Sequence, residues 1–399
     1  MYMRTLRTMT LAAVAMALIP GATTAAHGDV AGAAQIMQGA EQQGLSAGYP
    51  GVAALVTDGV SGQYTIAGTG NLGTHAPIDP TAQFRIGSIT KQFTITVVLQ
   101  LEAEGKLSMD DTVAKWLPNA IPASTGYDGS KVTLRELANQ TSGLPDYAFG
   151  YPDVTGANAT RVMAPQDLVN SALLTHPGTV QPGENTPTTA DPPAPYRYIN
   201  TGYILLGMVI QKITGNDPGL EIKNRIITAL NLTGTSFPTT DPNLYGNYIH
   251  GYYFTVVAGF NLGTVEVSVQ APSMLWTAGA MVSTLQDLMT FTQSLIQGRL
   301  LPAAQMTELE TTVPIDPSGQ TTGNRFGLGV VHYPLNCSGT TKWVWGMGGD
   351  TLGYNSRWMV SEDGHKSVVY TSNEYHGTGD LPGANALVTG IHSAMCALP

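Results

Sequence analysis

The feature that most constrains the fold of this chain is a serine and a lysine, three residues apart, at the start of an apolar and uncharged segment. Ser88 and Lys91 follow Gly87, and the apolar residues behind them are Phe93, Ile95, Val97, Val98, Leu99 and Leu101. Residues three apart on an α-helix share one face, so the Lys91 amine can reach the Ser88 hydroxyl. Because an ammonium group is costly to bury without a role, the segment predicts a buried helix that carries a nucleophile beside its base.

This pair of side chains is typical of an activated serine. A serine hydroxyl is inert at neutral pH without a neighbouring base, and burial can lower the pKa of a lysine until its neutral amine accepts the serine proton. Backbone amides at the start of the helix would point at an oxyanion formed there. The same pattern also recurs by chance, usually as a solvated surface pair, so its interpretation depends on the other motifs.

The first 26 residues have the order of segments found in a secretory signal. Arg4 and Arg7 precede an apolar run from Leu11 to Ile19, and small residues follow up to Ala26. The apolar run is too short to span a bilayer, and no later stretch has the length of a membrane-spanning helix. We therefore expect cleavage near Ala26 and a secreted, extracellular protein without a membrane anchor.

The charge of the chain argues against two classes of partner. The full chain carries a formal charge of −10, and loss of the two signal arginines takes it to −12, which disfavours nucleic acid and anionic membranes. Only 12% of the residues are charged and 43% are apolar, so a substantial core can form. The sequence leaves the oligomeric state open.

The two cysteines are Cys337 and Cys396. In an exported protein they favour one disulfide, here between a loop before a late strand and the C-terminal helix; two separate buried thiols are the alternative. No Cys-x-x-Cys or His-x-x-x-His spacing accompanies them, and the eight histidines are scattered. We expect no metal site and no cofactor.

Hydrophobic periodicity and turn residues divide the mature chain into two lobes. Besides the helix that carries Ser88, helices are expected at 30–43, 132–140, 165–174, 201–214, 220–230, 284–298 and 384–395, and strands at 51–60, 63–70, 341–346, 354–360 and 366–371. The two ends, 27–104 and 266–399, then form one α/β lobe. Residues 105–265 are expected to be short helices and long loops, which together form a mainly helical insertion.

The stretch Gly44-Leu45-Ser46-Ala47-Gly48 matches the Gly-x-Ser-x-Gly elbow of α/β hydrolases. That elbow needs a strand before the serine and a helix after it, whereas here the expected helix precedes and the expected strand follows. We interpret the stretch as a helix-to-strand loop, without a catalytic role for Ser46.

A second candidate motif is Tyr198-Ile199-Asn200-Thr201-Gly202-Tyr203. Residues two apart in an extended segment can point to the same side, so Tyr198 and Asn200 can both enter a cleft. A phenol can relay the serine proton to a leaving amine, and the Asn200 amide can hold the lysine and the acyl part of a substrate. The alternatives are a tyrosine at the edge of the core and an asparagine that caps the helix from Thr201, although the capping role is compatible with the catalytic one.

Together these motifs resemble the serine penicillin-recognising hydrolases, which include class C β-lactamases, D,D-carboxypeptidases, D-aminopeptidases and D-amino-acid amidases. The similarity runs over nearly the whole mature chain and rests on residues 84–91, 132–147, 198–203 and 276–284. It implies an α/β, β-lactamase/transpeptidase-like fold, in which helices flank an antiparallel sheet and a mainly helical lobe is inserted. Secreted D,D-carboxypeptidases look most similar, since their late cysteine pair also resembles Cys337 and Cys396.

The resemblance also implies roles for individual residues. Ser88 would be acylated, and Lys91 and Tyr198 would move protons. The oxyanion would lie between the backbone amide of Ser88 and that of a residue on a late strand. The candidate substrate-binding residues are Asn200, Gly349 and Asp350.

The third family motif departs from the usual pattern. Relatives carry Lys-Thr-Gly or His-x-Gly, and the corresponding stretch is 346–354, with Met347 in place of the cation. Gly348 and Asp350 replace two hydroxyl residues, and Val330 replaces an arginine that receives the terminal carboxylate of a peptide. An acidic residue without that arginine is a poor carboxylate receptor.

These departures leave several interpretations open. His332 or Arg357 can replace the missing arginine if the fold brings one of them close. Asp350 favours a cationic group such as a free α-amine if it faces the cleft, or it is a solvated turn residue. Met347 is otherwise ordinary core filler. The proline-rich stretch 184–195 is either a stiff rim of the site or a plain surface loop.

The sequence therefore predicts a secreted, cofactor-free serine hydrolase that forms an acyl-enzyme with D-amino-acid amides, esters or peptides. Its partner would be a small-molecule or peptide substrate with D-residues, a stereochemistry that the resemblance alone implies. The first alternative is a serine D-Ala-D-Ala carboxypeptidase that binds penicillin. The second is a non-hydrolytic module that binds cell-wall peptide or a β-lactam.

Overall fold

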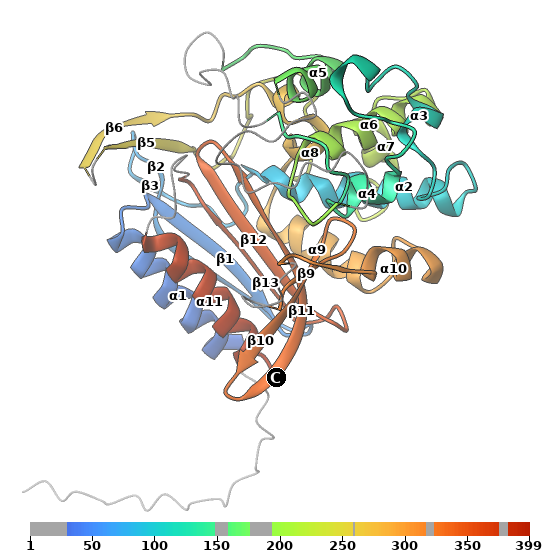
Figure 1. Ribbon diagram of the computed structural model, residues 1–399. Helices are drawn as coiled ribbons and strands as arrows, with labels where there is room; N and C mark the ends of the chain where they lie inside the picture. Colours follow the sequence, from blue (N-terminus) through green and yellow to red (C-terminus); the bar gives the residue numbers. More distant parts are fainter. Residues whose placement is uncertain (1–29, 148–158, 176–193, 258–259, 317–322, 375–381) are drawn as a thin grey trace, which may run out of the picture.

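The computed structural model describes residues 30–147, 159–175, 194–257, 260–316, 323–374 and 382–399. The predicted signal segment 1–26 and most of the proline-rich stretch 184–195 lie outside these residues. Within them, two helices cover one face of a large antiparallel sheet and a mainly helical layer lies beyond the other face (Figure 1). The expected antiparallel sheet with flanking helices is confirmed.

The described strands form a nine-stranded sheet in the order β3-β2-β1-β13-β12-β11-β10-β9-β8. Their bounds are β1 Gly51–Thr57, β2 Gly62–Asn71, β3 Ala76–Pro77, β8 Val313–Pro314, β9 Arg325–Phe326, β10 Val331–Cys337, β11 Thr340–Thr351, β12 Tyr354–Ser361 and β13 Ser367–Ser372. The first hairpin closes onto the last strands, because β1 pairs with β13 from Val52↔Ser372 to Thr57↔Ser367. Segments from both ends of the described chain thus share one sheet.

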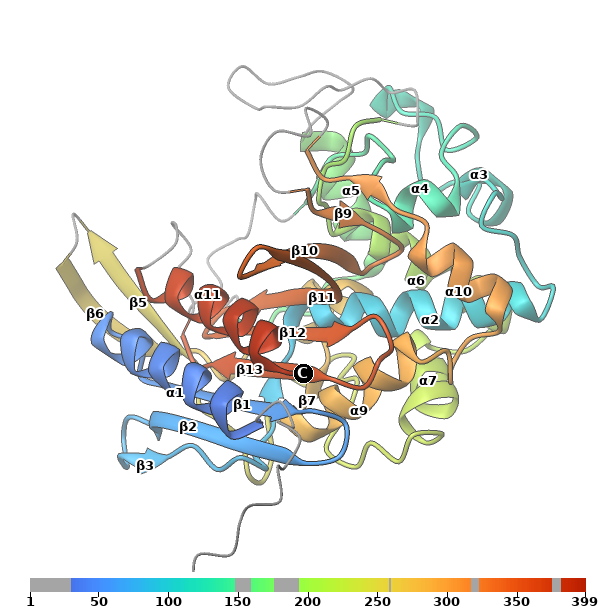
Figure 2. The same cartoon turned by 90° about the horizontal axis from the view of Figure 1, so that it is seen from below.

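Helices α1 (Val30–Ser46) and α11 (Pro382–Ala397) lie side by side on one face of this sheet (Figure 1 and Figure 2). The buried residues of α1 recur at helical spacing, with Ala33, Met37 and Ala40 turned inward. On the other face lie α2 (Thr90–Ala103) and α9 (Leu285–Ile296), where Phe93 stacks on Phe291 at 3.6 Å between ring centroids. The helix that carries Lys91 is therefore part of the core.

The remaining described elements include several helices that pack against α2. The helices are α3 Val113–Trp116, α4 Leu134–Ala138, α5 Pro165–Thr175, α6 Thr201–Thr214, α7 Pro218–Ile222, α8 Trp276–Gly279 and α10 Ala303–Glu310, with short turns at Gly87–Ile89, Ala123–Thr125, Lys223–Ile227 and Pro272–Met274. Two short pairings, β4 (Phe84–Arg85) with β7 (Val282–Ser283) and β5 (Tyr252–Val257) with β6 (Phe260–Glu266), complete the list.

Several predicted elements differ from the observed ones. The helix 201–214 has the predicted bounds, whereas the helix predicted at 132–140 is shortened to α4, which begins at a capping box of Thr133 and Glu136. The predicted strand 341–346 continues to Thr351. The hairpin β5–β6 was expected to be loop, although its aromatic and β-branched residues suit strands. The division into lobes at 105 and 265 stays a prediction.

The Gly44–Gly48 stretch has the order that argued against a catalytic elbow. Ser46 is the last residue of α1, and β1 follows at Gly51. The Ser46 hydroxyl donates a hydrogen bond to the Gln42 carbonyl oxygen at 2.8 Å, on the exposed surface. The interpretation as a helix-to-strand loop is confirmed.

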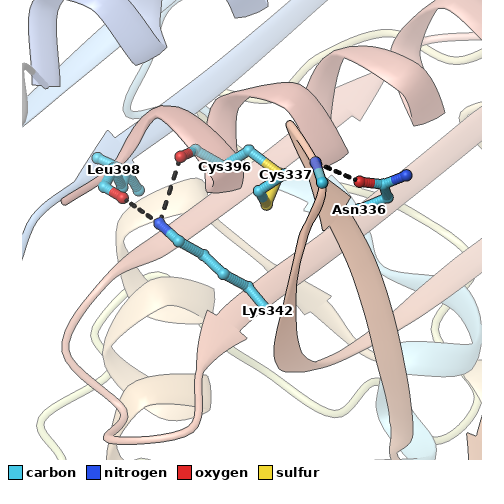
Figure 3. The surroundings of a disulfide bond; sticks show 6 residues. Asn336, Cys337, Lys342, Cys396 and Leu398 are labelled. Carbon is cyan, nitrogen blue, oxygen red and sulfur yellow. Dashed lines mark hydrogen bonds between the residues drawn. A yellow bond between two sulfur atoms is a disulfide. The ribbon is translucent and has the colours of Figure 1, made fainter.

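The predicted disulfide is confirmed between Cys337, at the end of β10, and Cys396 in α11 (Figure 3). Beside it the Lys342 amine donates hydrogen bonds to the carbonyl oxygens of Cys396 at 3.3 Å and Leu398 at 2.9 Å. These contacts fasten the C-terminal helix to the edge of β10 and β11. None of the described helices combines the length and the apolar character that a bilayer crossing requires.

Candidate active site

Ser88 lies in a short turn, Gly87–Ile89, that leads directly into α2. The turn presses against β11, since a Cβ atom added to Gly87 would lie 2.5 Å from the Asp350 carbonyl oxygen, and one added to Gly349 would overlap the Ile86 carbonyl. Gly87 also has a φ of +50°, which glycine tolerates far better than other residues. Two glycines thus allow the Ser88 turn and the end of β11 to meet backbone to backbone.

Lys91 is fully buried one turn along the helix. Its Nζ atom lies 3.0 Å from Ser88 Oγ, 2.7 Å from Asn200 Oδ1 and 2.8 Å from the Ala278 carbonyl oxygen. Burial lowers the pKa of Lys91 to about 7, against a smaller opposite effect of the Asp146 and Asp350 carboxylates. A large fraction of the amine is therefore neutral near pH 7, as a base for Ser88 requires.

The Tyr198 hydroxyl completes this group of polar atoms. It is buried, and among the described residues no partner meets it with full hydrogen-bond geometry. Burial raises the pKa of Tyr198 well above its usual value, and the nearby Ser88 hydroxyl opposes that rise only in part. Lys91 Nζ lies 4.9 Å from the centre of the tyrosine ring. The phenol consequently holds its proton at neutral pH and can donate it.

Asn200 connects Lys91 to a buried carboxylate. Its Oδ1 accepts from Lys91, while its Nδ2 donates to Asp146 Oδ2 at 3.2 Å and its backbone N–H donates to Asp146 Oδ1 at 3.0 Å. The expectation that Asn200 caps α6 with its side chain is wrong, because no such hydrogen bond forms. The side chain instead accepts a hydrogen bond from Lys91 and donates one to Asp146.

The end of β11 lies against the Ser88 turn and forms one wall of the site. Strand β10 pairs with β11 only up to Val331↔Gly346, so within the described residues the edge from Met347 to Thr351 has no strand beside it on that side. The backbone N–H of Asp350 therefore lies close to the Ser88 turn, where a second oxyanion donor is expected. Gly349 shapes this wall by lacking a side chain.

Asp350 lies inside β11 and is exposed, rather than in a turn. Its carboxylate accepts a hydrogen bond from the Asn355 amide on β12. The same carboxylate raises the pKa of both Lys91 and Tyr198, which requires it to lie within electrostatic reach of them. A negative charge therefore stands at the rim of the site.

The other positions of the third motif are occupied as follows. Met347 and Val330 are buried, as core filler, so no cation lies at either position. His332 is hydrogen-bonded to Glu362 and stacked on Trp345. Arg357 lies beside the third motif itself: it pairs with Gly348 of β11, and its guanidinium lies 3.3 Å from the point that a Cβ of Gly348 would occupy.

Sequence reasoning missed two contributors to the site. Asp146 follows the Gly-Leu-Pro of the 132–147 segment, and a buried acid 54 residues from Asn200 leaves no local pattern. The Ala278 group that contacts Lys91 is a backbone carbonyl, and every residue type has one, so the sequence could not single it out. Within the described residues, no three His, Cys, Asp or Glu side chains gather into a possible metal site.

The fold is shared with proteins of known structure. The sequence profile of the family described as Beta-lactamase matches residues 33–392. A D-stereospecific amidohydrolase from a Streptomyces species is 33% identical, with a TM-score of 0.77 over 90% of this chain and 98% of its own. D-amino acid amidase from Ochrobactrum anthropi has the same fold, with a TM-score of 0.76 at 23% identity over 92% of this chain and 98% of its own.

Penicillin-binding protein 4* of Bacillus subtilis is 26% identical over 76% of this chain. The match covers 63% of that relative, so this chain spans less than two thirds of its length.

Proposed function

The chain belongs to the beta-lactamase family, and on this premise we propose that it is a serine hydrolase that forms an acyl-enzyme with D-amino-acid amides, esters or peptides. The observation that carries the proposal is the buried Lys91 amine, which contacts Ser88 Oγ and Asn200 Oδ1 at once. A structural lysine gains nothing from a pKa lowered by burial, whereas a general base needs it. The motifs in the sequence and the family match support the same chemistry.

The first half of the reaction would acylate the serine. Ser88 Oγ attacks the carbonyl carbon of the substrate, and its proton passes to Lys91 Nζ. The oxyanion that forms accepts hydrogen bonds from the backbone N–H groups of Ser88 and Asp350. As the tetrahedral intermediate collapses, the bond to the leaving nitrogen or oxygen breaks. Tyr198 donates its proton to that atom and takes one back from the Lys91 ammonium, so the charges balance.

The second half would release the product. Water attacks the carbonyl carbon of the acyl-enzyme and gives a proton to the neutral Lys91 amine. The same backbone N–H groups hold the second oxyanion. When the bond to Ser88 Oγ breaks, the serine recovers its proton from Lys91, and the acid leaves. Each group returns to its starting protonation state.

The substrate class follows from the charges around the cleft. An exposed carboxylate at Asp350, close enough to raise the pKa of Lys91, would attract the free α-ammonium of an aminoacyl amide or ester. Met347 and Val330 offer no charge to a terminal carboxylate. Two similar structures are described as a D-stereospecific amidohydrolase and a D-amino acid amidase, which supports D-configured substrates here.

One observation favours the second candidate, a D-Ala-D-Ala carboxypeptidase. The Arg357 guanidinium lies beside Gly348 on the sheet and is a cation that a terminal carboxylate could approach. It is largely buried next to the Tyr333 and Tyr370 side chains, however, and the Asp350 carboxylate interacts with the same charge. We therefore rank this activity below amide hydrolysis. The contacts of Lys91 argue against a purely binding role.

We also propose that the protein acts outside the cytoplasm. The Cys337–Cys396 disulfide supports this proposal, because such bonds persist in oxidising compartments. Residues 1–26 would supply the signal. Mass spectrometry of the protein from the culture medium tests both, since it should find a mature N-terminus near His27 and an oxidised cysteine pair.

The decisive experiment compares three substrates: D-phenylalanine amide, its N-acetyl derivative and an acyl-D-Ala-D-Ala peptide. The proposal expects hydrolysis of the free amide, a stable or transient acyl adduct by mass, and loss of both in Ser88→Ala. Asp350→Asn should raise KM for the free amide roughly tenfold to a hundredfold, the worth of a hydrogen bond to a charged group. Turnover of the acetylated amide, which lacks the ammonium, is the control and should not change in this way.

The outcomes separate the candidates. Turnover of only the D-Ala-D-Ala peptide would support the carboxypeptidase activity instead. Arg357→Lys should then slow the hydrolysis of that peptide. No turnover and no adduct with any of the three substrates would leave a binding module. Equal rates of hydrolysis for L- and D-phenylalanine amide would contradict the proposed preference for D-configured substrates.

A further inference from the structure

Asp146 is a buried acid with an unusual set of partners. It is 5% exposed, and both of its carboxylate oxygens face the start of α6. Oδ1 accepts from the Asn200 backbone N–H at 3.0 Å, with the Thr201 hydroxyl at 3.5 Å, and Oδ2 accepts from Asn200 Nδ2 at 3.2 Å. The carboxylate thus binds one residue through its backbone and its side chain together.

These bonds decide which way the Asn200 amide points. An ionised carboxylate only accepts hydrogen bonds, and an asparagine side chain has one accepting and one donating end. The donating Nδ2 must therefore face Asp146, which leaves Oδ1 to face Lys91, 2.7 Å from its Nζ. With the amide reversed, Oδ1 would face the carboxylate in a repulsive contact, and Nδ2 would meet the protonated Lys91 amine donor to donor.

We propose that Asp146 is a positioning residue for the acyl-transfer reaction: it fixes the orientation of the Asn200 amide and holds a negative charge behind it, toward Lys91. This role rests on the proposed serine hydrolase chemistry. Among the described residues, Asp146 accepts its hydrogen bonds from Asn200 and Thr201, so its effect on the reaction passes through Asn200 and through the electrostatic field at Lys91.

The charge of Asp146 has its own measurable consequence. The groups that act on Lys91 are the carboxylates of Asp146 and of Asp350 on β11, with the phenol rings of Tyr198 and Tyr203 beside its amine. Of the two carboxylates, Asp146 raises the pKa of Lys91 more. The charge of Asp146 should therefore show in the pH at which Ser88 reacts, and the orientation of Asn200 should show in the rate.

The test follows Ser88 rather than a chosen substrate. A fluorophosphonate probe labels an activated serine covalently with loss of fluoride, and the rate of labelling is measured by intact mass from pH 5 to 9. In Asp146→Asn we expect labelling to slow roughly tenfold to a hundredfold through misorientation of Asn200, while the acid limb of the profile moves to lower pH by about one unit. Asp167→Asn, an exposed acid in the first turn of α5, is the matched control and should keep the wild-type profile.

A second variant tests the charge in the opposite direction. Asp146→Asn combined with Asn200→Asp exchanges the two side chains and places the carboxylate directly on Lys91. The acid limb should then move to higher pH than in the wild type. Opposite shifts in the two variants are not expected from loss of packing.

Unshifted profiles in both variants, or an Asp146→Asn variant that reacts like the wild type, would overturn the positioning role. If Asp146→Asn does not fold, the double variant Asp146→Asn/Asn200→Asp is the test. Its acid limb must then lie at higher pH than that of the wild type, or the positioning role is wrong. Labelling of Ser88 without hydrolysis of D-phenylalanine amide would contradict only the substrate class. Absence of labelling in the wild type would contradict the hydrolase and this role together.

Discussion

The backbone of Gly87 lies directly against the backbone of Asp350, so that the turn before Ser88 and the end of β11 meet without a side chain between them. A Cβ on Gly87 would approach the Asp350 carbonyl oxygen to 2.5 Å and its nitrogen to 2.7 Å. This contact brings the Ser88 and Asp350 amides to one place, where an oxyanion would need them both. It also joins residues 263 positions apart in the chain.

Gly87→Ala should therefore abolish most of the activity. The methyl group would push the Ser88 turn away from β11, and a displacement of the order of 1 Å costs about a hundredfold in rate. Gly105→Ala is the control, because Gly105 also has a positive φ, +69°, but nothing lies within 4 Å of its Cβ position. Gly105→Ala should lose roughly 1 to 2 kcal/mol of stability through its left-handed backbone alone, and Gly87→Ala should lose more, because its Cβ also meets the Asp350 backbone; urea unfolding measures both. Equal loss of kcat/KM in both would contradict the role of the contact.

The pH dependence of the wild type should report Lys91. Its pKa is lowered to about 7 by burial, and only the neutral amine accepts the Ser88 proton. kcat/KM should therefore rise with pH and level off above about pH 7 to 8. Lys91→Met should lose activity by about a thousandfold, within the usual range for general bases. The activity that remains should no longer rise with pH near pH 7. If the rise near pH 7 persists in this variant, the titrating group is not Lys91.

Tyr198→Phe should remove proton transfer to the leaving group but keep the fold. The hydroxyl is buried without a full hydrogen bond in the described residues, so its loss costs little stability, while kcat should fall about a hundredfold to ten-thousandfold. Tyr203→Phe is the matched variant, because that hydroxyl donates to the Ala138 carbonyl oxygen at 2.9 Å. It should lose about 1 kcal/mol of stability with little change in rate. The reverse pattern, measured by thermal unfolding and steady-state kinetics, would be inconsistent with Tyr198 as the proton donor.

Glu41 should make the protein less stable as the pH rises. This carboxyl of α1 is fully buried; burial raises its pKa to about 7, against a weaker opposite effect of the hydrogen bond from Thr65. The folded state thus favours the protonated acid: its stability contribution is complete below about pH 4.5, falls between pH 4.5 and 7, and is absent above. The loss amounts to roughly 3 kcal/mol. Glu41→Gln should be more stable than the wild type at pH 8 and lose that advantage at pH 4.5, as followed by thermal unfolding; parallel curves would contradict this.

The elements that could be predicted from the sequence have strong local patterns. Helix 201–214 is predicted at its observed bounds because apolar residues recur at helical spacing, and in the structure Gly215 ends it in a left-handed conformation. The hairpin of β1 and β2 has alternating or continuous apolar residues around a Ser-Gly turn. The strands β8 and β9 escaped prediction, since two residues are too short for any periodicity. Strand β10 escaped as well, although its seven residues largely alternate between buried and less buried positions.

The Asn200 side chain illustrates where local reasoning stops. Its position just before a helix is typical of a cap, yet the amide is used on Lys91 and Asp146 instead. A buried amine and a buried carboxylate each need hydrogen-bond partners, and their positions come from distant parts of the chain. Which of the two roles the Asn200 side chain takes can be decided only once its tertiary contacts are known.

By itself, the sequence determined the reactive pair, because Ser88 and Lys91 are three residues apart on one helix and helical geometry alone makes them meet. It also determined the disulfide pair and the general fold. Only the tertiary structure decided the surroundings of that pair: the three acceptors on Lys91, the buried Asp146 behind Asn200, the approach of Gly87 to Asp350, and Arg357 beside Gly348. These contacts join segments tens to hundreds of residues apart, and their distances and burial set the lysine pKa and the charge of the cleft.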